Sequence, residues 1–155
     1  MTSPRALSRI RVAHLPQGYS FHARVDGDAA AGFGIDADQV ALIFRRAEAD
    51  DDHEHPLVVY VGSPSAGALT GTEGRTGAVV ELASGISAEY HDGLWAIGEG
   101  PDARQAGPQT IHWDASVAHS LTVRSRRFVF AVRGSKHRGA TFDELAEVAR
   151  AVKLA

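Results

Sequence analysis

The sequence contains no cysteine among its 155 residues. This absence excludes disulfide bonds, thiolate zinc sites and thiol nucleophiles, and it is compatible with either redox compartment. Long apolar runs are also missing, because no stretch reaches the ~18 residues of a membrane span and residues 1–21 lack the apolar core of a secretory signal. We therefore predict no membrane span in this chain. A chain that starts natively at residue 1 is expected in the cytoplasm, whereas one trimmed of an upstream signal or anchor would be extracytoplasmic.

Excess positive charge is absent too, since the formal net charge is −3. This argues against a globally cationic nucleic-acid binder. What is present is an ordinary globular composition, with 44% hydrophobic and 23% charged residues. Because domains usually hold ~100–200 residues, we expect a single domain over residues 1–155 with one hydrophobic core.

The C-terminal segment has the clearest helical pattern. Thr141 and Glu144 have the spacing of a capping box, in which each residue bonds the backbone amide of the other. Apolar residues then recur at helical spacing from Phe142 to Val152. The pattern predicts an amphipathic helix from about residue 142 to about residue 153.

Period-two alternation of apolar residues predicts strands upstream of this helix. Ser125–Arg127 fits a hairpin connection between two of them, and His91–Gly93 fits a turn joining two others. The predicted strands are residues 19–25, 57–62, 78–83, 86–91, 94–98, 109–113, 120–124 and 128–133.

Residues 36–49 fit either a capped helix or a strand, because Asp36 and Gln39 suit a helix cap while Val40, Leu42 and Phe44 alternate. We favour a strand at 39–46, which forms a long hairpin with 57–62. The predicted fold class is α+β, a mainly antiparallel β-sheet with one capped C-terminal helix packed on a face.

The order of short motifs resembles a known class of domains. The motifs are an entry at Leu15–Tyr19, a segment at Gly85–Gly93, a strand from His112 to Val123, and the final helix that begins at Phe142. In this order they resemble the small extracytoplasmic domains attached to bacterial anti-sigma factors and to sporulation or envelope lipoproteins. The resemblance implies a sensing or protein-interaction domain and carries over no catalytic residues.

One cluster of aromatic and histidine side chains is a candidate ligand site. Both tryptophans lie on strands predicted to be neighbours, where they line an apolar pocket or, alternatively, serve as structural residues whose indole N–H groups bond backbone carbonyls. In a pocket, the histidines would act as general acid or base near neutral pH. The candidate ligand-binding residues are Tyr90, Trp95, His112, Trp113 and His119.

A second candidate is a metal site at Asp51, His53 and His55, which project to one side of an extended segment. The alternative is a solvated acidic loop. The glycine-rich run 62–77 has no Walker or dinucleotide-binding spacing, and we predict no cofactor. The basic stretch 124–138 suits phosphate contacts, but its aromatic residues Phe128 and Phe130 alternate into the predicted core, which argues against nucleic acid as a partner.

These observations favour a non-enzymatic sensing or interaction domain that uses a sheet face or edge. Its expected partner is a protein, a peptide or a small ligand, because an open antiparallel sheet offers an exposed face and unpaired edges. The alternative is a small pocket enzyme with an aromatic-lined cavity and a histidine acid/base.

Overall fold

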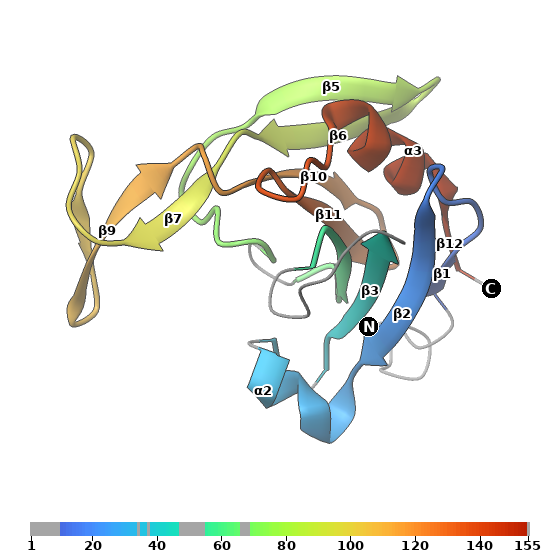
Figure 1. Cartoon of the computed structure of the whole chain (residues 1–155), viewed down its shortest axis with the longest axis horizontal. Helices are drawn as coiled ribbons and strands as arrows, with labels where there is room; N and C mark the ends of the chain where they lie inside the picture. Colours follow the sequence, from blue (N-terminus) through green and yellow to red (C-terminus); the bar gives the residue numbers. More distant parts are fainter. Residues whose placement is uncertain (1–9, 34, 37, 47–54, 66–68, 155) are drawn as a thin grey trace.

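A computed structural model describes residues 10–33, 35–36, 38–46, 55–65 and 69–154 of the chain (Figure 1). Strands dominate this part, and one helix of ten residues lies near the C-terminus. The elements in chain order are β1 (Ile10–Val12), β2 (Tyr19–Val25), η1 (Gly27–Ala29), α2 (Ala30–Phe33), β3 (Val40–Arg46), β4 (Leu57–Gly62), β5 (Ala78–Ala83), β6 (Ile86–His91), β7 (Leu94–Ile97), β8 (Arg104–Ala106), β9 (Gln109–Asp114), β10 (Ala118–Arg124), β11 (Val129–Ser135), α3 (Phe142–Ala151) and β12 (Val152–Leu154).

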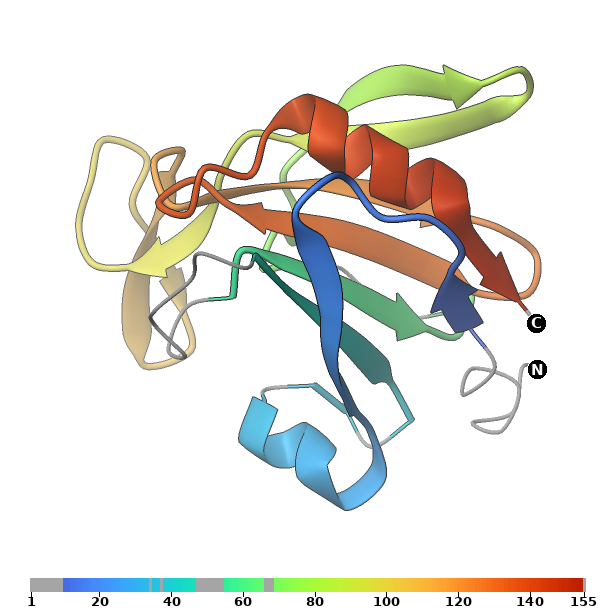
Figure 2. The same cartoon turned by 45° about the vertical axis from the view of Figure 1, so that its right-hand side comes forward.

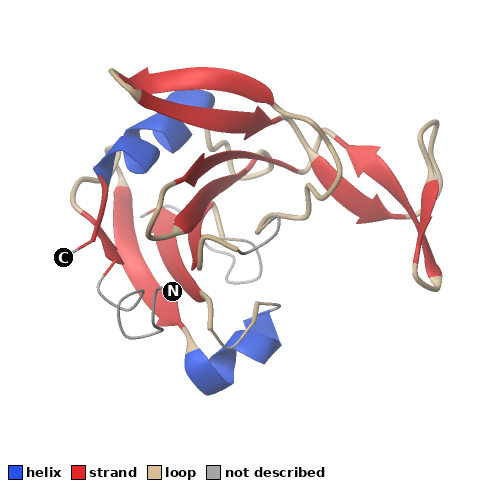
Figure 3. Cartoon of the chain, turned by 180° about the vertical axis from the view of Figure 1, so that it is seen from behind, coloured by secondary structure: helices blue, strands red, loops and turns tan. Residues whose placement is uncertain are grey.

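The strands form three antiparallel sheets. The largest has seven strands in the order β2-β3-β4-β11-β10-β6-β5, and it curves around the main core. A three-stranded sheet, β7-β9-β8, projects from one end of it as an arm (Figures 1 and 3). The third is a short ribbon in which β1 pairs with β12.

Helix α3 lies across one face of the seven-stranded sheet (Figure 2). The predicted capping box is present: Glu144 N donates to Thr141 Oγ1 at 3.2 Å and Thr141 N donates to Glu144 Oε1 at 2.9 Å. Leu145 and Val148 on the apolar side of the helix are fully buried, and the helix packs against core strands β10 and β11. The predicted α+β class, with an antiparallel sheet and a packed C-terminal helix, is therefore confirmed.

The ambiguous segment before residue 47 is a strand, β3, and it pairs with β4 as predicted. Alternate residues of β3 face two cores. Leu42 and Phe44 belong to the main core beneath α3. Ala41 and Ile43 belong to a smaller core on the opposite face, where Phe33 of α2 packs.

The structure refines two expectations and adds four short elements. His91–Gly93 connects β6 to β7 as expected, but these two strands do not pair, because β6 lies in the large sheet while β7 pairs with β9 in the arm. The C-terminal helix ends at Ala151, and Val152–Leu154 continues as a strand because it pairs with β1. Elements β1, η1, α2 and β8 were not predicted; they are three or four residues long, too short for a periodic pattern to develop.

Within the described part of the chain, β2 and β5 form the two edges of the large sheet, and each has an irregular register. On β2, Phe21 pairs with Phe44 and Ala23 with Ile43, so His22 is an extra residue. On β5 the extra residue is Leu82, between Glu81 and Ala83. Both edges are therefore bulged, which disfavours the pairing of another strand.

Candidate functional site

The two tryptophans lie side by side, as the sequence predicts. Trp95 on β7 is directly opposite Trp113 on β9, and their ring centroids are 5.4 Å apart in an edge-to-face arrangement. Each indole N–H donates to a backbone carbonyl: Trp95 to Glu73 at 2.8 Å and Trp113 to Asp92 at 3.0 Å. These contacts match the alternative in which the two tryptophans are structural residues whose indole N–H groups bond backbone carbonyls.

Arginine side chains cover the two indole rings. The Arg104 guanidinium carbon lies 4.1 Å from the Trp95 ring centroid, and that of Arg75 lies 4.5 Å from Trp113. Arg75 also donates to Asp102 at 3.0 Å. We call Arg75, Trp95, Arg104 and Trp113 the arm ladder. It links the arm to the loop at residues 69–77, because Trp95 Nε1 and Arg104 Nη2 both donate to the Glu73 carbonyl oxygen.

Tyr90 and His119 lie elsewhere, on the face of the large sheet that α3 covers. The Tyr90 ring packs edge-on against Phe142 with centroids 5.1 Å apart. His119 Nε2 lies 2.7 Å from the Ala140 carbonyl oxygen. Because that oxygen only accepts, Nε2 carries the proton, and Nδ1 accepts from the Tyr90 hydroxyl at 2.8 Å. Burial lowers the pKa of His119, so the ring is held neutral between strand and loop.

His112 occupies a third position. Its neighbour Trp113 faces the other side of β9, and His112 packs against the backbone of Gly98 and Gly100. Its Nδ1 atom has no hydrogen-bond partner among the described residues. The five predicted ligand-binding residues are thus divided among three places, and only the tryptophan pair and the Tyr90–His119 pair are in direct contact.

The predicted metal site is only partly within the described residues. Asp51 and His53 lie outside them. His55 is described, and its ring centroid lies 6.1 Å from that of Phe33 and 6.2 Å from that of His22. The described ranges contain no group of three histidine, aspartate or glutamate side chains placed to hold a metal ion.

A polar cleft of about 270 Å³ lies between the loop at 72–75 and the uncovered face of β6 and β10. His91 is buried at its side and bonds the Arg75 carbonyl oxygen at 2.7 Å, while the Glu89 carboxylate accepts from Gly77 N at 2.9 Å. Acidic and basic groups are balanced there, so the cleft has no dominant charge. Its lining residues are Thr72, Glu73, Gly74, Arg75, Glu89, His91, Thr122 and Arg124.

A second cavity, also of about 270 Å³, is mainly apolar and lies between β1 and the β2–β3 hairpin. We call it the apolar groove. Its floor is continuous with the main core, and Phe21 stands at its side, 57% exposed, with its ring 6.0 Å from that of buried Phe44. The lining residues are Ile10, Arg11, Val12, Leu15, Phe21, Arg24, Leu42 and Phe44.

The bulge on β2 determines which side chains enter the apolar groove. Strict alternation from Phe21 would direct Ala23 to the same face and Arg24 to the opposite one. Because His22 is an extra residue, Arg24 instead pairs with Leu42 and shares the core-side face with Phe21. Its Nη2 atom lies 3.5 Å from the Ile10 carbonyl oxygen, across the groove.

The comparisons with known proteins identify no family. No protein-family model matches the chain, and no curated protein matches it significantly. A crystal structure from Bacteroides thetaiotaomicron is similar with a TM-score of 0.45 and 11% identity, covering 95% of this chain and 48% of that one. The chain thus spans about half the length of that protein. Such a likeness carries no argument about activity. No helix in the described ranges is long and apolar enough to cross a membrane.

Proposed function

We propose that this protein is a non-enzymatic ligand-interaction domain that binds a small ligand in the apolar groove on the core-side face of its sheet. The observation that carries the proposal is the groove itself. An aromatic side chain, Phe21, is more than half exposed beside apolar residues that continue into the core. Concave apolar sites with a few polar groups are the usual form of small-ligand sites.

The irregular edges of the large sheet favour binding on a face of the sheet rather than along an edge. An added strand needs a regular row of unpaired backbone groups. Both edge strands of the large sheet, β2 and β5, interrupt that row with an extra residue. A ligand that uses side-chain contacts in the groove does not need a regular edge.

The arrangement of titratable groups gives less support to the pocket-enzyme alternative. The candidate acid/base, His119, is buried beneath α3 with both ring nitrogens engaged by Tyr90 and Ala140. The tryptophan pair lies in the arm, apart from His119, and each indole N–H donates to a backbone carbonyl oxygen. The resemblance to bacterial sensor domains likewise favours binding, and sensing of an envelope component is the finer role that we propose for it.

A neutral fluorescent dye, Nile red, tests the proposal. We expect its emission to rise and shift to the blue on addition of wild-type protein, because the dye enters an apolar site. Phe21→Ser should weaken dye binding by about tenfold, since one large side chain contributes roughly 1.5–3 kcal/mol of apolar contact.

The matched control is Val79→Ser, which changes an apolar side chain that is 79% exposed on β5, outside the groove. Dye affinity should be unchanged in this variant. Equal dye binding by Phe21→Ser and wild type, or an equal loss in both variants, would contradict binding in the apolar groove.

A further inference from the structure

We infer that the face of the large sheet away from α3 carries a second binding site, which takes a small aromatic carboxylate beside Arg133. The site is a pocket of about 230 Å³ between α2, β4 and β11, and we call it the aromatic pocket. Phe33, Val58 and Tyr60 line it and also form part of the smaller core, on the side of the sheet where α2 lies (Figure 2). The sheet therefore separates the aromatic pocket from the apolar groove, and the inference stands independently of the proposed function.

The charge of the aromatic pocket is the first argument. Arg133 is the only arginine or lysine among the described residues that line it, and these residues include no aspartate or glutamate. The polar cleft on the same face differs, because Glu73 and Glu89 there accompany two arginines. A concave site lined by charge of one sign attracts ligands of the opposite sign. The aromatic pocket therefore favours an anion.

The contacts of Arg133 are the second argument. This side chain is partly buried and forms a hydrogen bond with the Tyr60 hydroxyl. Burial raises the pKa of Tyr60, so the hydroxyl keeps its proton at neutral pH and does not balance the charge of the guanidinium. Among the described residues, no carboxylate forms an ion pair with Arg133. A carboxylate ligand supplies that charge, and its two oxygens match the fork of the guanidinium.

Aromatic rings and size define the rest of the ligand. The Phe33 ring centroid lies 6.1 Å from that of His55 and 6.2 Å from that of Tyr60, with the ring planes tilted by 35° and 33°. All three rings line the aromatic pocket, and a further ring that enters it gains contacts of the same kind. A volume of about 230 Å³ is below the usual ~300–1,000 Å³ of ligand pockets. It therefore suits one ring with a short anionic substituent.

Benzoate and benzamide test the inference, because both carry a phenyl ring and only benzoate is charged. Each would be titrated into the full chain while backbone amide signals are followed by NMR. We expect shifts at β4 and β11, with benzoate binding at least about tenfold more tightly than benzamide. Acetate, which has the charge without the ring, should bind at least about tenfold more weakly than benzoate.

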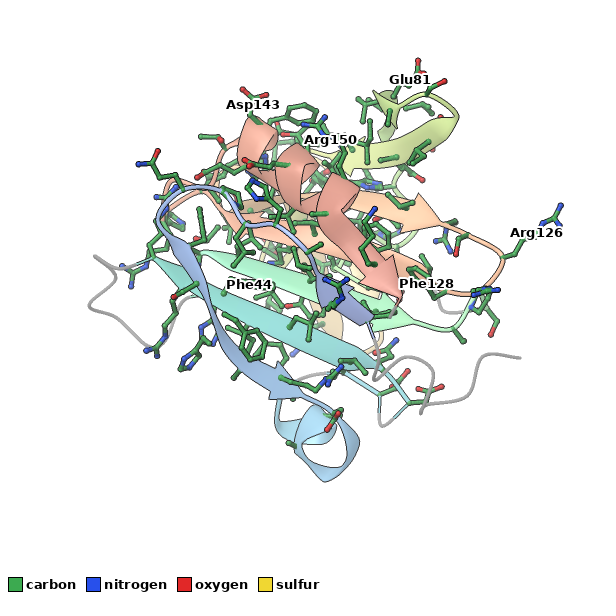
Figure 4. The ribbon with its side chains drawn as sticks, turned by 90° about the vertical axis from the view of Figure 1, so that its right-hand side faces the viewer. Phe44, Glu81, Arg126, Phe128, Asp143 and Arg150 are labelled. Atoms are coloured by element: carbon green, nitrogen blue, oxygen red, sulfur yellow. The ribbon has the colours of Figure 1, made fainter. Side chains whose placement is uncertain are left out.

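Three variants complete the test. Arg133→Gln should remove the preference for benzoate and leave benzamide affinity unchanged, whereas Arg133→Lys keeps the charge without the fork and should keep only part of the preference. The matched control, Arg126→Gln, removes an exposed arginine at the β10–β11 turn (Figure 4) and should keep the preference in full. Ser135 of the aromatic pocket lies at the other end of that hairpin, where it pairs with Ala118. The amide spectrum reports whether each variant is folded, and Arg133→Lys carries the test if Arg133→Gln is not.

The outcomes separate this inference from the proposed function. Benzoate binding no tighter than benzamide or acetate overturns the inference, and so does an unchanged preference in the folded Arg133 variant that carries the test. A preference that is lost in Arg126→Gln as well overturns it, because the effect is then one of general charge. Shifts confined to β1 and β2 place the compounds in the apolar groove, which overturns the inference and supports the proposed function. Phe21→Ser should leave benzoate affinity unchanged, so failure of the Nile red test does not affect the aromatic pocket.

Discussion

The large sheet and the arm are stabilised by different interactions. Every residue of β4 is buried, and so is most of β11. The apolar side of α3 packs into the main core on one face of these strands, and the smaller core covers the other face of β4. In the arm no residue of β7, β8 or β9 is fully buried. The arm instead depends on directional contacts, the indole–carbonyl bonds and the arginines of the arm ladder. One short chain thus combines a region stabilised by apolar burial with a region stabilised by specific pairs.

The largest effect is expected from a change in the buried region. Leu145→Ala removes a fully buried side chain of α3, so the free energy of unfolding should fall by about 3–4 kcal/mol. Urea unfolding followed by circular dichroism measures this. The arm should unfold in the same transition, because it is attached to the large sheet through β6 and β10. A second transition for the arm alone would contradict that expectation.

A change at the junction of the two regions should have a smaller effect. Gly93 has a φ of +126°, and a Cβ there would lie 2.6 Å from Trp113 Nε1. Gly93→Ala should cost about 2 kcal/mol or more, through strain and a lost indole contact. The control is Gly85→Ala at φ +76° with open space around it, which should cost only about 1 kcal/mol. Equal losses in urea unfolding would show that the packing around Trp113 contributes little.

The smallest effect is expected within the arm. Arg104→Gln removes the cation over Trp95 and the bond from Nη2 to the Glu73 carbonyl oxygen at 3.0 Å. The arm should lose about 0.5–1 kcal/mol, seen as faster amide hydrogen exchange in β7 and β9 while α3 exchanges as in the wild type. Arg126→Gln is the matched control. Faster exchange in α3 as well would mean that the two regions are not distinct.

The sequence predicts where the longer strands lie better than how they are arranged in sheets, for a physical reason. Apolar patterns are local, and so β2, β3 and β4 in the large sheet and β7 and β9 in the arm are close to their predicted bounds. The capping box likewise marks the start of α3 from local chemistry alone. No local signal shows that the chain leaves the large sheet after His91 and enters the arm. The residues His91–Gly93 suit a turn within a hairpin and a connection between two sheets equally well. Only the pairing of β7 with β9 decides between them.

The candidate site shows a similar division. The prediction that the two tryptophans are neighbours is confirmed, since it follows from strand pairing. Tyr90 and His119 lie beneath α3, away from the tryptophans. Their position depends on the register of β6 with β10 and on where the helix packs, and neither can be read from residue spacing. Phe21 and Arg24 were missed because alternation assigns them to opposite faces. Only the bulge brings them together.

The extra residue in β2 also affects how related chains should be compared. In a regular strand, a phenylalanine and an arginine on one face are separated by one residue, whereas here two residues separate Phe21 from Arg24. A relative without residue 22 would keep the same two side chains in the groove with a shorter spacing. The groove is therefore encoded by the number of residues as well as by their identity, and an alignment that scores substitutions alone would overlook a chain that preserves it through a deletion.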